Sequence, residues 1–202
     1  MRKYLLFIIV ITQLMIISCE PKPSGEGINL PPIAIGLKVS PDTAYIKLGD
    51  TVYLTASVSS TLSNGVKLED GKAIVDLFIG YINQTPITTF AFDAALPNEH
   101  LLIFEDSGGV NISNETGKVT HIYALPYGDS LQVALAFVPL KKGTYGFQIQ
   151  SMFYEGSKGK TRTQPYFINE NHHFDELWRI PGNSYYPGEQ GYDSRYYFAV
   201  TD

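Results

Sequence analysis

The sequence has a single cysteine, Cys19, among 202 residues. One thiol cannot form an intramolecular disulfide, so the core and the strand ladders must stabilise the fold even in an oxidising compartment. Basic residues are also few, with 15 Lys and Arg against 20 Asp and Glu. An acidic chain with dispersed charges argues against nucleic acid as a partner.

Catalytic motifs are missing as well. The sequence has no Gly-x-Ser-x-Gly nucleophile motif and no phosphate-binding glycine loop. The acidic stretches at 69–71 and 105–108 lack the donor spacing of a calcium loop, so we expect turns there. We therefore expect a protein without enzymatic activity, cofactor or metal.

Long apolar runs are absent apart from one near the start, Tyr4 to Ile17, which follows Arg2 and Lys3. The run falls short of the ~20 residues that a membrane-spanning helix needs, and it suits the apolar region of a secretory signal peptide. It ends in the sequence Ile-Ile-Ser-Cys at residues 16–19. An ordinary signal peptide cut elsewhere, or a retained short membrane anchor, are the alternatives to the interpretation that follows.

Residues 16–19 resemble the lipobox of bacterial lipoproteins. The resemblance implies that residues 1–18 are removed as a signal peptide and that the Cys19 thiol carries a diacylglycerol, often with a further acyl chain such as palmitate on the new amino group. Several acyl chains hold a protein firmly in a membrane. Cys19 would then anchor the protein in the cell envelope, in the outer membrane, with the side of that membrane left open.

The processed chain would have 13 basic and 20 acidic residues, a formal charge of −7. Residues 19–32 are rich in Pro and Gly and poor in apolar side chains, which predicts a flexible tether behind the lipidated cysteine. The remaining residues, 33–202, are long enough for one domain with a good core.

Alternation of apolar and polar residues dominates this domain. Val52, Leu54, Ala56 and Val58 alternate with polar residues and Tyr53, which indicates a half-buried strand. Similar rows occupy residues 75–81, 131–137, 145–153 and 195–201, with shorter runs at 33–39, 45–48, 87–92, 101–104 and 118–125. Frequent turn residues separate the runs. The pattern predicts an all-β fold, an antiparallel immunoglobulin-like β-sandwich.

The segment from Lys141 to Phe147 resembles the corner between two sheets of immunoglobulin-like domains. In such corners a tyrosine hydroxyl bonds to the backbone a few residues upstream. The resemblance implies that Tyr145 has this role. The Cys-Trp-Cys core of antibody domains is absent.

Residues 155–191 lack strand periodicity, so we expect a long aromatic-rich loop before the last strand, with a helical turn at 174–178. Trp178, Tyr185, Tyr186 and Tyr192 are its candidate ligand-binding residues, because flat rings stack on sugars and recur in protein interfaces. Tyr196, Tyr197 and Phe198 follow closely. Alternatively these rings fold the loop onto the domain, as buried aromatics do.

One ligand-rich cluster is present: His172, His173, Asp175 and Glu176. Adjacent histidines chelate one ion poorly because they point in different directions. A zinc site would need a donor such as His100 or His121. We therefore expect solvated histidines in a polar loop.

Together these features predict a lipid-anchored envelope lipoprotein that acts as a non-catalytic binding module for carbohydrate or an envelope partner protein. The alternative is a structural or assembly component of a cell-surface complex, whose exposed sheet edge pairs with its neighbours.

Overall fold

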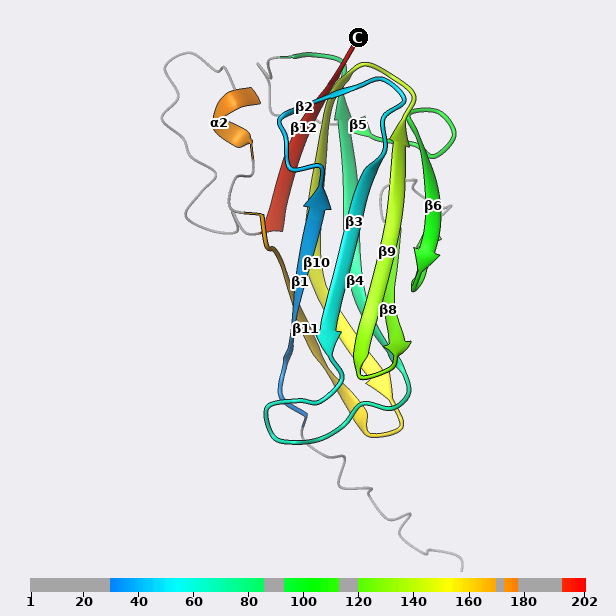
Figure 1. Ribbon diagram of the computed structural model, residues 1–202, viewed down its shortest axis with the longest axis vertical. Helices are drawn as coiled ribbons and strands as arrows, with labels where there is room; N and C mark the ends of the chain where they lie inside the picture. The colour runs from blue at the N-terminus through cyan, green and yellow to red at the C-terminus, as the bar shows by residue number, and fades with distance from the viewer. Residues whose placement is uncertain (1–29, 86–92, 113–119, 170–172, 178–193) are drawn as a thin grey trace, which may run out of the picture.

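The structure is a computed structural model that describes residues 30–85, 93–112, 120–169, 173–177 and 194–202 (Figure 1). In these ranges one helical turn, α2 (Phe174–Leu177), accompanies the strands. The strands are β1 (Ile33–Ser40), β2 (Tyr45–Lys47), β3 (Val52–Ser59), β4 (Lys72–Ile82), β5 (Asp93–Ala94), β6 (Leu101–Ser107), β7 (Gly109–Ile112), β8 (Thr120–Tyr127), β9 (Ser130–Pro139), β10 (Gly143–Gly156), β11 (Gly159–Phe167) and β12 (Arg195–Thr201). The predicted all-β class and the helical turn are confirmed. The run expected at 87–92 lies outside the described residues.

The strands close into a barrel in the order β10–β11–β1–β3–β9–β8–β4, and β4 pairs again with β10. Strands β8 and β11 each pair on both sides, which joins the two layers of the expected sandwich. Closure also uses a parallel pair, β1 with β11, with Ile33 opposite Thr163. The prediction of an antiparallel sandwich is therefore corrected to a closed barrel with outer strands.

The predicted loop at 155–191 is also corrected, because its first part is a hairpin of β10 and β11. The alternation of β11 is hidden in the sequence because a threonine, Thr163, takes an inward position and is fully buried. Its hydroxyl donates to the Ile74 carbonyl at 2.8 Å and accepts the Met152 amide at 2.9 Å. Met152 lies where the β4–β10 register shifts, so this hydroxyl satisfies an amide that the bulge leaves out of the ladder.

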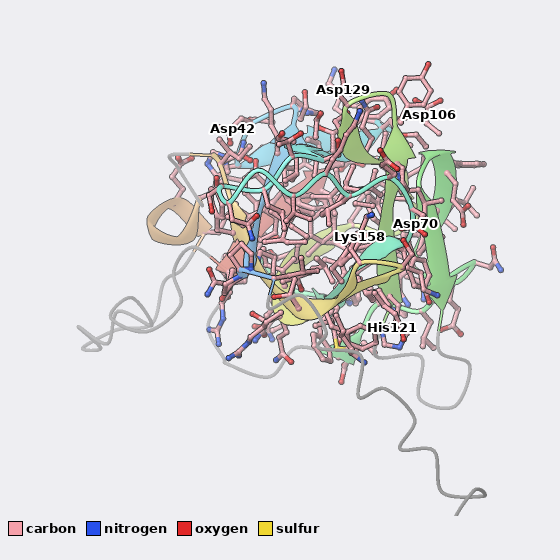
Figure 2. The ribbon with its side chains drawn as sticks, turned by 90° about the horizontal axis from the view of Figure 1, so that it is seen from below. Asp42, Asp70, Asp106, His121, Asp129 and Lys158 are labelled. Carbon is pink, nitrogen blue, oxygen red and sulfur yellow. The ribbon has the colours of Figure 1, made fainter. Side chains whose placement is uncertain are left out.

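The barrel interior is filled by the inward rows of the strands (Figure 2). At its centre Phe147 contacts Phe137 and Phe198 with ring centroids 5.0 and 5.4 Å apart, and Tyr145 stacks on Phe198 at 5.4 Å. The predicted inward row of β4 is confirmed, since its alternate residues from Val75 to Tyr81 are all buried. Burial of these rings and of the aliphatic side chains around them stabilises the barrel.

Tyr145 forms the corner that the sequence indicates. Its hydroxyl is 3.1 Å from the Lys141 carbonyl and 2.7 Å from the His100 carbonyl, and the side chain is 1% exposed. The two acceptors belong to the β9–β10 connection and to the residue before β6. The hydroxyl thus connects the corner to a third segment of the barrel.

Gly108 is the crossing point between β6 and β7. β6 pairs with β9, and β7 pairs with β8, so the chain passes between β8 and β9 at this residue. Gly108 has φ +79°, and a Cβ there would lie 2.4 Å from the Tyr123 carbonyl oxygen. Only glycine fits a left-handed conformation against backbone at this distance. The crossing fixes β6 along the part of β9 with which it pairs.

Candidate functional site

The residues predicted from sequence to bind a ligand, Trp178, Tyr185, Tyr186 and Tyr192, lie outside the described residues, as does Cys19. The last members of the same aromatic cluster are described. Tyr196, Tyr197 and Phe198 lie in β12 and are 0%, 8% and 2% exposed. These three rings are therefore buried core residues and not exposed ligand-binding residues.

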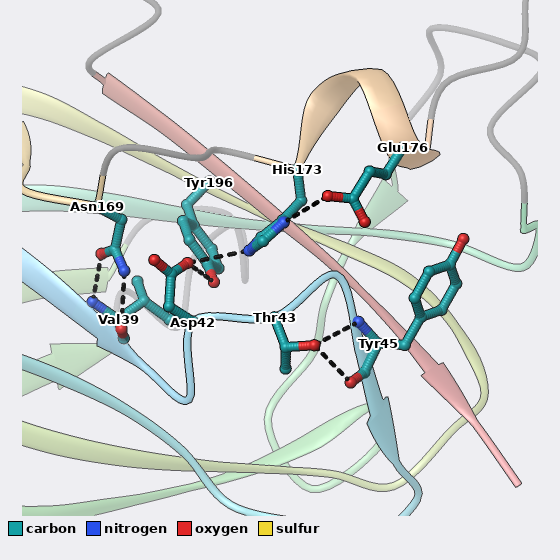
Figure 3. A network of polar contacts seen from close by, with 8 residues as sticks. All are labelled: Val39, Asp42, Thr43, Tyr45, Asn169, His173, Glu176 and Tyr196. Carbon is teal, nitrogen blue, oxygen red and sulfur yellow. Dashed lines mark hydrogen bonds and ion pairs between the residues drawn. The ribbon is translucent and has the colours of Figure 1, made fainter.

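The histidine cluster differs from the prediction of a solvated loop, because His173 is buried (Figure 3). Its Nε2 lies 3.0 Å from Asp42 Oδ1, and its Nδ1 lies 3.4 Å from Glu176 Oε1. His172 lies outside the described residues, and Asp175 is part of α2. Since both ring nitrogens of His173 already face carboxylates, the imidazole is not available to a substrate.

Asp42 is the hub of this network. The Tyr196 hydroxyl donates to Asp42 Oδ1 at 2.9 Å. Burial by itself would raise the pKa of Asp42, but hydrogen bonds from Asn169, Tyr196 and His173 outweigh it and hold this pKa below its usual range. Burial, together with the nearby Asp42 carboxylate, raises the pKa of the Tyr196 phenol. An ionised Asp42 carboxylate therefore accepts the hydrogen bond of a neutral Tyr196 phenol.

Asn169 continues the pairing of β11 along β1 with its side chain. The Asn169 amide accepts from the Val39 N–H at 2.8 Å and donates to the Val39 carbonyl at 3.0 Å. Leu177 of α2 is fully buried in a small cluster with Tyr197 and Ala199. Leu177 and Tyr196, which flank residues 178–193, are therefore both fixed to the barrel. We assign the network a structural role, because it joins the β1–β2 turn, α2 and β12.

The other histidines lie elsewhere. His121 Nδ1 is 2.5 Å from Asp76 Oδ1 in a pair between β8 and β4, on a different side of the barrel from Asp42 (Figure 2). His100 Nδ1 accepts the Leu96 amide at 3.1 Å. Among the residues that the structure describes, no group of three or more His, Cys, Asp and Glu side chains could hold a metal ion.

A different surface brings exposed aromatic side chains together. We call it the aromatic face: the outward side of β11, β1, β3, β9 and β6. Four of its large apolar side chains are exposed, namely Tyr53, Phe104, Tyr166 and Ile168. Tyr166 and Ile168 lie over Gly36 of β1, where a Cβ would be 3.1 Å from the Tyr166 hydroxyl and 2.9 Å from Ile168 Cδ1.

Tyr53 and Phe104 occupy one row across the aromatic face. Tyr53 of β3 lies opposite Ala136 of β9, and Phe104 of β6 lies opposite the same alanine. Ser40 of β1 continues the row beyond Tyr53. Residues opposite one another on neighbouring strands share a face of the sheet, so the two rings flank a methyl group. Tyr53 is 49% and Phe104 54% exposed.

Sequence reasoning placed Tyr53 on the outward side of its strand but did not connect it with Phe104. The two residues are about fifty positions apart, and only the register of β9 joins them. An exposed aromatic residue at an outward strand position is the one signal that the sequence offered.

No protein-family model and no curated protein matches the sequence. Among solved structures, the chain is similar to the human F-spondin reeler domain, with 8% identity, coverage of 85% of this chain and 92% of that chain, and a TM-score of 0.39. It is similar to a type II cohesin domain from the cellulosome of Acetivibrio cellulolyticus, with 10% identity, coverage of 67% and 92%, and a TM-score of 0.33. These values assign the chain to no family. Within the described residues, no helix has the length and apolarity to cross a membrane.

Proposed function

We propose that this protein is an exported envelope lipoprotein, anchored through Cys19, whose barrel is a non-catalytic binding module for carbohydrate or an envelope partner protein. The aromatic face is the observation that carries the binding function. Soluble domains bury most aromatic rings, and exposed ones gathered on one face mark interaction sites. Here four large apolar side chains lie exposed on one side of a barrel.

The start of the barrel fits a tethered domain. Leu30 is buried, and the Thr161 hydroxyl donates to the carbonyls of Leu30 and Pro31 at 2.9 and 3.1 Å. Residue 30, where the described part of the chain begins, thus lies at the end of the barrel that carries the β10–β11 turn (Figure 1). The ten residues from 20 to 29 would span up to ~33 Å when extended, which is enough to hold the barrel clear of a lipid headgroup layer.

Labelling with radioactive palmitate in a Gram-negative host tests the anchor. We expect the wild-type protein and the control Ser18→Ala, which keeps a small residue before the cysteine, to be labelled and to sediment with membranes. Cys19→Ala should lose both properties. A Cys19→Ala protein that is still labelled would contradict the proposal.

An assembly role is the second candidate, and β6 favours it. β6 pairs with β9 on one side, and no strand of the described residues pairs with its other side. A free edge accepts an extended segment of a partner by strand addition. Crosslinking in intact cells followed by mass spectrometry separates the two candidates, because a partner strand added to the free edge crosslinks to β6 alone, whereas a partner bound on the aromatic face also crosslinks to β1 and β3.

A further inference from the structure

We infer that the row Ser40–Tyr53–Ala136–Phe104 on the aromatic face is a stacking site for a linear, uncharged glycan. The inference rests on the proposed binding function and moves its site from residues 178–192 to the wall of the barrel. None of the four side chains is ionisable at neutral pH, and each belongs to a different strand.

The spacing of the two rings is the first argument. Tyr53 and Phe104 are separated by one intervening strand, β9, so their backbones lie about 10 Å apart at 4.7–4.9 Å per strand. This spacing suits rings that stack on alternate sugar units of an extended chain. A single compact ligand would contact one ring and miss the other.

The space between the rings is the second argument. Two neighbouring outward residues of β9 are small: Ala136 lies between the rings, and Ala134 is two residues further along the same strand. Thr55 lies opposite Ala134, and Lys38 lies opposite Thr55. The surface between the two rings is therefore lower than the rings themselves, and the hydroxyl groups of Ser40 and Thr55 lie close by. Flat apolar rings with hydroxyl groups beside them match a pyranose, which has apolar faces and polar edges.

The area is the third argument. A large aromatic side chain buries about 150–250 Å² when fully covered, so two half-exposed rings offer roughly 200 Å². Tyr166 and Ile168 lie on the same face and add to its exposed apolar area. Two rings of this size are large enough for two stacked sugar units.

Rigidity is the fourth argument. β3 and β9 are paired along both edges inside the barrel, and β6 is fixed by the Gly108 crossing. The rings stand on backbone that does not have to reorganise, which lowers the entropic cost of binding.

The test is calorimetric titration of the full-length protein, extracted from membranes in mild detergent, with cellohexaose, xylohexaose and mannohexaose. We expect at least one of the three to bind, and we expect Tyr53→Ala and Phe104→Ala each to weaken its affinity about tenfold or more. Ala136→Leu keeps both rings but fills the space between them, so it should weaken binding as well. Tyr127→Ala is the matched control, because Tyr127 is the most exposed tyrosine of the described residues (71%) and belongs to the β8–β9 hairpin away from the row.

Four results would overturn the inference. The first is the absence of binding to all three hexasaccharides. The second is equal loss of affinity in Tyr53→Ala and Tyr127→Ala. The third is loss of binding in Trp178→Ala with none in Tyr53→Ala and Phe104→Ala, which would keep the proposed binding module but return its site to residues 178–192. A protein partner crosslinked to the aromatic face, without glycan binding, would also keep the module and overturn the glycan.

Discussion

Replacement of Gly108 by alanine tests the crossing that positions β6 and Phe104. Gly108 and Gly128 share a left-handed conformation, with φ +79° and +59°, but their surroundings differ. A Cβ at Gly108 would lie 2.4 Å from the Tyr123 carbonyl oxygen and 3.0 Å from Val133 Cα, whereas a Cβ at Gly128 would meet nothing within 4 Å. Gly128→Ala therefore carries only the conformational strain, about 1–2 kcal/mol.

Gly108→Ala carries the same strain and in addition a clash with backbone atoms, which cannot move aside as a side chain can. Overpacking costs typically about 1–3 kcal/mol, and backbone contact places this case at the upper end. We expect Gly108→Ala to lose about 3 kcal/mol more than Gly128→Ala, which corresponds to a melting temperature roughly 6–12 °C lower for a domain of this size.

Urea denaturation followed by circular dichroism measures the difference. The pair Gly108→Asn and Gly128→Asn repeats the comparison with a residue that tolerates the left-handed region, so the strain falls away and the clash remains. Loss of folding in both Gly108 variants beside stable Gly128 variants is the extreme form of the expected result. Equal stability at the two positions, with either residue, would refute the reasoning about the crossing.

Three further predictions follow from the polar contacts. Tyr145→Phe should lower the free energy of unfolding by about 1–2 kcal/mol, because the His100 and Lys141 carbonyls lose the buried hydroxyl that they share. Tyr127→Phe at an exposed site should change it by less than about 0.5 kcal/mol, and equal effects in urea titrations would contradict the corner. The pKa of Asp42 is lower in the folded state than in the unfolded state. The contribution of Asp42 to stability is therefore present above its unfolded pKa and is lost as the pH falls through the folded pKa. Asp42→Asn should flatten the acid limb of a plot of unfolding free energy against pH. The pKa of Tyr196 is raised on folding, so its contribution to stability is full below the unfolded pKa of about 10 and declines above it. Tyr196→Phe should reduce the loss of unfolding free energy at alkaline pH. An unchanged alkaline limb would argue against the raised pKa.

Strands with regular alternation could be predicted from sequence. β12 has the predicted bounds, and β3, which alternates cleanly, begins one residue after the predicted Thr51 and ends at the predicted Ser59. Tyr145 was identified because a corner tyrosine bonds to backbone only four residues away, so its signal is local. Such features depend on neighbours in the chain.

Closure of the barrel could not be predicted in the same way. It depends on the parallel pair of β1 with β11 and on Thr163, whose polar side chain is buried because it satisfies a bulge in another strand. Burial of His173 has the same origin, since its partner Asp42 lies in a distant turn. The row Ser40–Tyr53–Ala136–Phe104 requires the register of four strands at once. A pattern along one strand contains none of this information.

The pairing of β1 with β11 also determines when the barrel can form. Val39 and Asn169, which bond at the end of this pair, are separated by 130 residues. Contacts between such distant segments make folding slow, because most of the chain must be ordered before they form. Until β11 is in place, β1 has an open edge, and any fragment that ends before it lacks a closed barrel. The four residues of the row Ser40–Tyr53–Ala136–Phe104 are synthesised early, yet they become a fixed surface only after β11 has paired with β1.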